Sequence, residues 1–115
     1  MDFDRYTVTM LMLRPDAPVM SEDEAGELQD RHLAHGADLQ EQGIILARGP
    51  FMDQDDPQYR GFSIWSVDAG TARAHAERDP AVLAGRLAVS VMTWMMPAGN
   101  LQFTKVRVPR SRAEV

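Results

Sequence analysis

The chain has 115 residues, a mass of 12.9 kDa and a formal net charge of −5. With 44% hydrophobic and 25% charged residues, it has the composition of a globular protein that buries a core, not of a disordered chain. Cysteine is absent, which excludes disulfide scaffolds, thiolate nucleophiles and cysteine-ligated metal centres.

Charge is unevenly distributed along the chain. Residues 1–60 carry 13 acidic and 5 basic side chains, whereas residues 61–115 carry 4 acidic and 7 basic ones. An acidic surface repels phosphate backbones, so we expect no nucleic-acid partner. No segment offers the ~18 apolar residues that span a bilayer, and the N-terminus lacks a basic and apolar signal region. We therefore expect a cytoplasmic protein with no membrane partner.

The first elements are expected to be a strand and a long helix. Residues 6–13 are apolar and β-branched and are soon followed by a proline, a pattern typical of a strand. Ser21 precedes Glu24 by three residues, a capping-box spacing that predicts a helix over 22–42 ending at Gly43.

The rest of the chain completes a recognisable order of elements. We expect a strand at 44–47, an exposed loop at 53–60, a strand at 61–67, a helix at 69–78 capped by Asp68, a helical turn at 81–83 and a strand at 87–96. This β-α-β-β-α-β order predicts an α+β, ferredoxin-like fold with an antiparallel sheet. We expect one domain over 1–115, with its core at about 6–96 and an extended tail at 97–115 that can add a strand at 101–108. The basic cluster of the tail is typical of a solvated chain end; it consists of Lys105, Arg107, Arg110 and Arg112.

His32 lies on the apolar face of the first helix. The residues that share this face at helical spacing are Ala25, Leu28, His32, Gly36 and Leu39. An imidazole placed there points into the fold, and periodicity alone favours a core histidine bonded to a backbone carbonyl. His35 lies at the edge of the same face and Arg31 on its flank, whereas His75, on the second helix, is expected at the surface.

Asp79 stands at a helix break, because the residue before a proline avoids the helical region. Such a carboxylate is usually a cap or turn residue. Next to an imidazole it would instead orient the ring and raise its basicity, which gives an acid–base pair. The two helices of a split βαβ unit lie side by side, so the topology can bring Asp79 to His32.

Other catalytic templates are missing. The sequence has no phosphate-binding glycine loop and no HExxH motif, and His32 and His35 lack the carboxylates to complete a metal site. We therefore expect neither a metal nor an organic cofactor. Trp65 and Trp94 are suited to an apolar pocket, and the methionines around Trp94 to a soft core or a dimer surface.

Several motifs together resemble one family. They are R-H-L-A at 31–34, L-Q-E-Q-G-I-I-L-A-R-G-P at 39–50, G-F-S-I-W at 61–65 and D-P-A-V-L-A-G at 79–85. Over residues 6–96 the chain resembles the YciI-like, or YCII-related, family. The resemblance implies a dimeric α/β barrel, in which two ferredoxin-like subunits pack their sheets together. It also implies a pocket with a His–Asp pair, at the positions of His32 and Asp79.

The resemblance also implies a chemistry. Known activities in the family resemble cofactor-free elimination, such as dehydrochlorination of a hydroxylated aromatic ring. We therefore expect a lyase or isomerase for a small aromatic or polyketide-like substrate, with His32 moving the proton and Asp79 fixing its tautomer. The other residues expected to contact substrate are Arg31, His35, Gly49, Pro50, Phe51 and Trp65. Two alternatives stay open: a non-catalytic ligand-binding or accessory protein, and a cofactor-free oxygenase of the dimeric α/β-barrel type.

The strands also favour a homodimer. Residues 6–13 and 87–96 are apolar on both faces, as in strands that are buried on both sides. Helices cover only one face of such a sheet, and a second copy of the chain is the simplest cover for the other.

Overall fold

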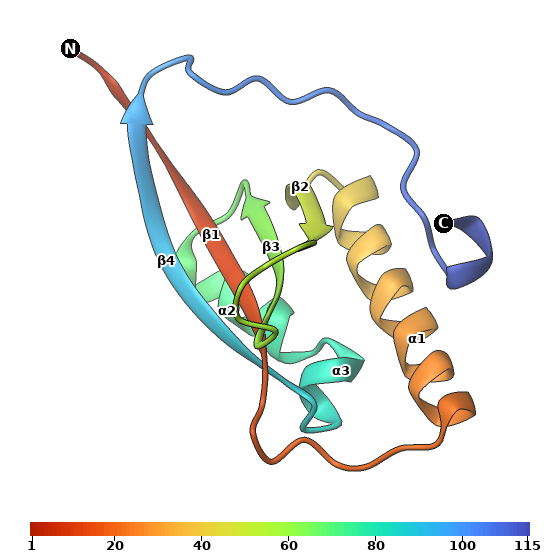
Figure 1. The fold of residues 1–115 in the computed structure, drawn as a ribbon. Coiled ribbons are helices and arrows are strands. Elements are labelled where there is room, and N and C mark those ends of the chain that lie inside the picture. The colour runs from red at the N-terminus through yellow and green to blue at the C-terminus, as the bar shows by residue number, and fades with distance from the viewer.

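The structure is a computed structural model that describes residues 1–115. Its elements are β1 (Phe3–Leu13), α1 (Glu22–Glu41), β2 (Ile45–Pro50), β3 (Tyr59–Trp65), α2 (Ala69–Glu77), α3 (Pro80–Leu83), β4 (Leu87–Pro97) and a 3₁₀ turn, η1 (Arg112–Glu114). The strands form one antiparallel sheet in the order β2–β3–β1–β4, with the α-helices on one of its faces (Figure 1). The predicted ferredoxin-like fold is confirmed. None of the helices combines the length and apolar character needed to cross a bilayer.

The helix ends follow from local side-chain chemistry. At the start of α1, the Ser21 hydroxyl accepts from the Glu24 amide at 3.1 Å, and the Glu24 carboxylate accepts from the Ser21 amide at 3.4 Å. After α1, Gly43 takes a left-handed conformation with φ of 76°, which a glycine adopts without strain. Asp68 caps α2 by accepting from the Thr71 amide at 2.8 Å. Each of these caps confirms a sequence-based expectation.

Trp65 is the centre of the core between the helices and the sheet. It is 3% exposed and packs in one cluster with Leu39, Ile45, Ala72 and Ala76. The two alanines allow α2 to lie close to the sheet, so that the indole fills the space between them. A smaller cluster of Leu28, Ala81 and Leu87 lies under α3.

The opposite face of the sheet is apolar and uncovered by helices; we call it the open face. In the middle of this face, Val8 of β1 lies opposite Ile64 on β3 and Met92 on β4. Tyr6 lies opposite Trp94, whose ring contacts the Phe62 ring edge-on at 6.4 Å. Met92 and Trp94 are each 44% exposed, which is unusual for large apolar side chains in the middle of a strand.

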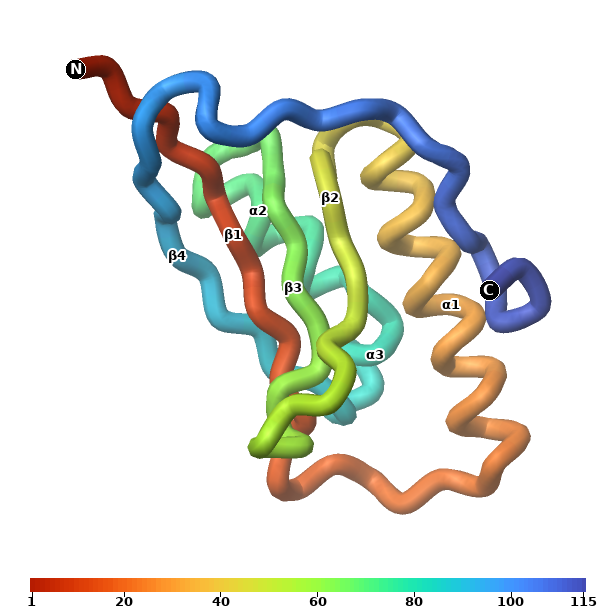
Figure 2. Tube along the Cα trace, turned by 45° about the horizontal axis from the view of Figure 1, so that its top comes forward, coloured from red at the N-terminus to blue at the C-terminus, as the bar shows by residue number.

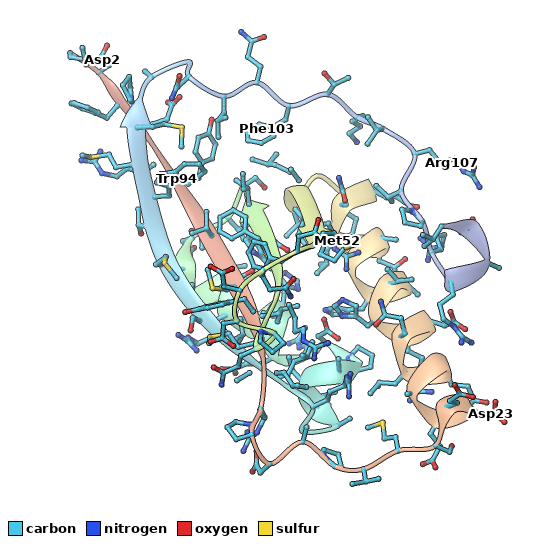
Figure 3. All side chains as sticks on the ribbon, viewed as in Figure 1. Asp2, Asp23, Met52, Trp94, Phe103 and Arg107 are labelled. Atoms are coloured by element: carbon cyan, nitrogen blue, oxygen red, sulfur yellow. The ribbon has the colours of Figure 1, made fainter.

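Residues 98–115, the C-terminal arm, leave β4 and cross to α1 (Figure 2). Phe103 points from the arm toward the sheet, where its ring meets that of Tyr6 at 5.5 Å (Figure 3). The arm joins no ladder, so the strand expected at 101–108 is not formed. The expected solvated end is only partly found, because Lys105 and Arg107 are exposed but two other arginines are held on α1. Arg110 pairs with Asp38 and Glu41, and Arg112 pairs with Asp30. Arg110 and Arg112 thus dock on the acidic outer face of α1, a long-range pairing that sequence periodicity does not reveal, whereas the exposed Arg107 pairs with Glu114 within the arm.

The Asp30→Ala substitution is expected to release the end of the arm. Asp30 accepts three hydrogen bonds from Arg112, from its backbone amide and from Nε and Nη2. These bonds lower the pKa of Asp30, so the contact should persist as pH falls to about 4 and weaken only below the ordinary aspartate range. Hydrogen exchange of the Arg112 amide, which donates to Asp30, and of the Glu114 and Val115 amides in the 3₁₀ turn after it should rise in this variant. It should not rise in Glu77→Ala, which removes an exposed carboxylate of α2. Equal exchange in all three proteins would contradict the docking.

Candidate active site

His32 and Asp79 meet beneath the helices. His32 comes from the middle of α1, and Asp79 is the residue that caps the start of α3. The His32 Nδ1 and Asp79 Oδ2 atoms are 2.6 Å apart, and the side chains are 14% and 8% exposed. The other carboxylate oxygen, Oδ1, accepts from the Ala81 amide at 2.9 Å. Asp79 is therefore both a helix cap and the partner of the imidazole, and the cap fixes the carboxylate in place.

The contact with Asp79 defines the state of the imidazole ring. A carboxylate can only accept a hydrogen bond, so Nδ1 carries the ring proton and donates it to Asp79. The lone pair of the neutral ring is then on Nε2, the nitrogen that lies 3.4 Å from Arg48 Nη2. The result is an oriented base whose Nε2 is turned away from the carboxylate and accepts only this long hydrogen bond.

A β-bulge brings Arg48 to this base. Ile45 lies opposite Trp65 and Ala47 opposite Ile64, so β2 contains one more residue than β3 at this point. The register after the bulge places Arg48 opposite Ser63, on the face that the helices cover. Without the extra residue, the alternation of the strand would turn Arg48 to the open face.

Gly36 makes the space that Arg48 occupies. A Cβ atom at this position of α1 would overlap the Arg48 guanidinium, which lies directly against the helix backbone. Arg48 Nη1 also donates to the Leu33 carbonyl at 3.4 Å. Burial lowers the pKa of the Arg48 guanidinium, and the negative charge of Asp79 opposes that effect. The arginine remains a cation, because its ordinary pKa is far above neutral.

A cavity of about 790 Å³ opens beside these groups, between α1, β2, β3 and the arm. This volume lies in the range of ~300–1,000 Å³ that is typical of small-molecule sites. Of the residues predicted from the sequence, His32, Gly49, Pro50 and Phe51 line it. Its apolar walls include Leu11, Leu33, Phe62, Leu87, Val106 and Val108.

The structure places three predicted substrate contacts outside this cavity. Arg31 is exposed on α1 and does not line it. The His35 ring donates from Nε2 to the His75 carbonyl at 2.9 Å, which ties α1 to α2. Trp65 donates from Nε1 to the Thr9 hydroxyl at 2.8 Å inside the core. Its ring stacks on that of His75, which is half-buried and not at the surface as expected, with 6.3 Å between the ring centres.

Other lining residues were not predicted from the sequence. Arg48 and the arm reach the cavity through a bulge and long-range ion pairs, which leave no periodic signal. Gln40 also lines it, and its buried Oε1 atom has no hydrogen-bond partner, so it can accept from a ligand. The usable signals are Gly26 and Gly36 in α1, where an added Cβ would overlap the guanidinium of Arg112 and of Arg48. A glycine inside a helix costs about 1 kcal/mol and often marks a close approach.

Comparison with known proteins identifies the family. No curated protein matches the chain. A similar solved structure is 5-chloro-2-hydroxyhydroquinone dehydrochlorinase (TftG) from Burkholderia phenoliruptrix AC1100, in complex with 2,5-dihydroxybenzoquinone. It is 21% identical, the match covers 77% of this chain and 90% of that one, and the TM-score is 0.48. The family model of the YCII-related domain matches residues 8–95, well over half of the sequence. The chain therefore belongs to the YCII-related domain family.

Proposed function

We propose that the protein is a small-molecule enzyme that uses His32 and Asp79 as a cofactor-independent acid–base pair, in a lyase or isomerase reaction. The observation that carries this proposal is the 2.6 Å contact between His32 Nδ1 and Asp79 Oδ2 beside the cavity. The contact leaves Nε2 as the nitrogen that can exchange a proton with a ligand. A general base of this kind needs a fixed ring, a defined tautomer and a partner that stabilises the imidazolium.

The reaction follows from these roles. The lone pair of His32 Nε2 takes a proton from the substrate, and Asp79 stabilises the imidazolium that results. In an elimination, the electrons of the broken bond to hydrogen form a new double bond, and the leaving group departs with its own electron pair. In an isomerisation, the imidazolium returns the proton to a different atom of the same molecule. Both reactions balance without an oxidant, a reductant or a metal.

The test is turnover without oxygen or added cofactor. The purified protein is incubated anaerobically with EDTA and a panel of chlorinated and unchlorinated hydroxyhydroquinones, and released chloride and ring absorbance are followed. Chloride release from the chlorinated compounds would support the lyase. A requirement for oxygen would favour the oxygenase instead. Saturable binding with no product from any member of the panel would favour a ligand-binding protein. Loss of turnover on chelation, restored by a metal, would contradict cofactor independence.

We further propose a homodimer joined through the open face. Val8, Ile64 and Met92 run across its centre, and the exposed Trp94 lies beside Phe62. A second copy that packs its own open face here removes exposed side chains such as Met92 and Trp94 from water, which is a favourable change of about 25 cal/mol per Å² of apolar area.

The Trp94→Glu substitution should break this dimer, because two carboxylates would then be buried in an apolar interface. Sedimentation at micromolar concentration is expected to give twice the chain mass for the unmodified protein. For the variant it should give the mass of one chain, 12.9 kDa. Val19→Glu, on an exposed loop away from the open face, should remain dimeric. A monomeric unmodified protein would rule out the proposal.

A further inference from the structure

We infer that the cavity binds an organic anion, whose acidic oxygen pairs with the guanidinium of Arg48 beside Nε2 of His32. This inference deepens the proposed function and rests on it for the place of the reacting atom. The chemical class is a ring-sized compound that carries a carboxylate, or a hydroxyl that ionises to a phenolate or enolate. Three features of the chain support this class.

The first feature is a pair of irregularities in the backbone that place Arg48 in the cavity. The bulge in β2 turns the side chain to the helix-covered face, and Gly36 lets the guanidinium lie against α1. A bulge disrupts the ladder, and a glycine weakens the middle of a helix. The bulge and the glycine both position the same side chain. Bulges are common next to active sites, where they direct a side chain toward a ligand.

The second feature is the missing counter-ion of Arg48. The guanidinium donates to the Leu33 carbonyl and contacts His32 Nε2, and no carboxylate lies within ion-pair distance of it. Asp79 is the nearby negative charge, but its oxygens are engaged by His32 and by the Ala81 amide. Partly buried cations are normally paired, because a charge removed from water costs free energy. An anionic ligand would supply the pairing that the chain itself does not.

The third feature is the sign of the charge around the cavity. Five arginines line it and no aspartate or glutamate does, in a chain whose net charge is −5. Arg107 and Arg112 pair with Glu114 and Asp30. Arg48, Arg60 and Arg86 form no ion pair, so their charge remains for a ligand. A positive cavity on an acidic protein attracts anions selectively.

Such an anion also suits the proposed chemistry. His32 removes a proton from a ring atom that neighbours the carbon bearing the oxygen. The electron pair of the broken bond then delocalises onto that oxygen. Arg48 lies beside Nε2 and can donate N–H groups to the oxygen as its charge grows. The apolar walls formed by Leu11, Phe51 and Phe62 accommodate the ring itself.

The test compares two probes of the same shape, benzoate and its neutral counterpart benzamide, by calorimetric titration at fixed ionic strength. The unmodified protein should bind benzoate at least about tenfold more tightly than benzamide. Arg48→Gln should bind the two about equally. Gly36→Ala should lose most of the preference, because the added Cβ displaces the guanidinium. Arg73→Gln removes a charge on α2 outside the cavity and should keep the full preference.

The inference fails if the unmodified protein binds both probes equally, or if a folded Arg48→Gln variant keeps the tenfold preference. The first outcome needs no variant, so a folding defect in Arg48→Gln does not protect the inference. The same titration of the His32→Ala variant separates this inference from the proposed function. A preference that survives in His32→Ala supports anion binding at Arg48 even if no turnover is ever found. Turnover that depends on His32 but shows no preference for anions would overturn the inference alone.

Discussion

The His32→Ala substitution is expected to lower kcat on a turned-over substrate by about 10²–10⁴-fold, the usual contribution of a positioned general acid or base. The loss follows from the removal of Nε2, the nitrogen left free by the contact with Asp79. Steady-state kinetics measure the effect, and the dissociation constant of benzoate gives an independent check that the cavity persists. Full activity in a correctly folded His32→Ala variant would contradict the acid–base proposal.

Asp79→Asn is the matched substitution for the carboxylate. Asparagine is as good a helix cap as aspartate, so the start of α3 should be preserved while the charge next to His32 is lost. We expect a rate loss of the same order. The double variant should be little worse than His32→Ala alone, because the two residues act as one unit. Additive losses would indicate two independent roles. If both single variants unfold, the pair is structural, as periodicity alone favours for His32.

The fold was predictable because its signals are local. The capping box at Ser21 and Glu24, the left-handed Gly43 and the cap at Asp68 each depend on residues within one turn of a helix. The order of elements then restricts the topology, because split βαβ units connect in one preferred way. The same logic brought Asp79 to His32: the topology places their helices side by side, although 47 residues separate them.

Other parts of the cavity depend on contacts that no local pattern encodes. One extra residue in β2 decides which face Arg48 occupies, and strand alternation read without that bulge gives the wrong face. The arm reaches α1 through ion pairs of Arg110 and Arg112 with carboxylates more than 60 residues away. Charge alone does not specify such a pairing, because several acidic residues of α1 compete for the same arginines.

Trp65 shows the limit of reading an aromatic residue from sequence. Its position in an apolar strand is equally typical of a cavity wall and of a core. The structure decides between them through the bond from Trp65 Nε1 to the Thr9 hydroxyl and the packing against Ala72 and Ala76. Phe62, three residues earlier on the same strand, lines the cavity, whereas Trp65 does not.

Trp65→Ala is therefore expected to lower the free energy of unfolding by about 3–5 kcal/mol, the usual cost of removing a large buried aromatic side chain. Trp65→Phe keeps most of the volume but leaves the buried Thr9 hydroxyl without its donor, at a cost of about 1–3 kcal/mol. Adding Thr9→Val to Trp65→Phe should recover part of that loss, because the unpaired hydroxyl is then removed. Urea unfolding measures all three.

Ligand binding distinguishes this core role from a role in the cavity. Trp65 is 3% exposed and lies outside the cavity lining, so Trp65→Phe should bind benzoate with the affinity of the unmodified protein. The Phe51→Ala variant is the matched comparison, because Phe51 lines the cavity and contacts Phe62 at a ring separation of 6.3 Å. It should weaken binding with a smaller effect on unfolding, since Phe51 is only half-buried. If Trp65→Phe weakens benzoate binding more than Phe51→Ala does, the indole belongs to the ligand site and its assignment to the core is wrong.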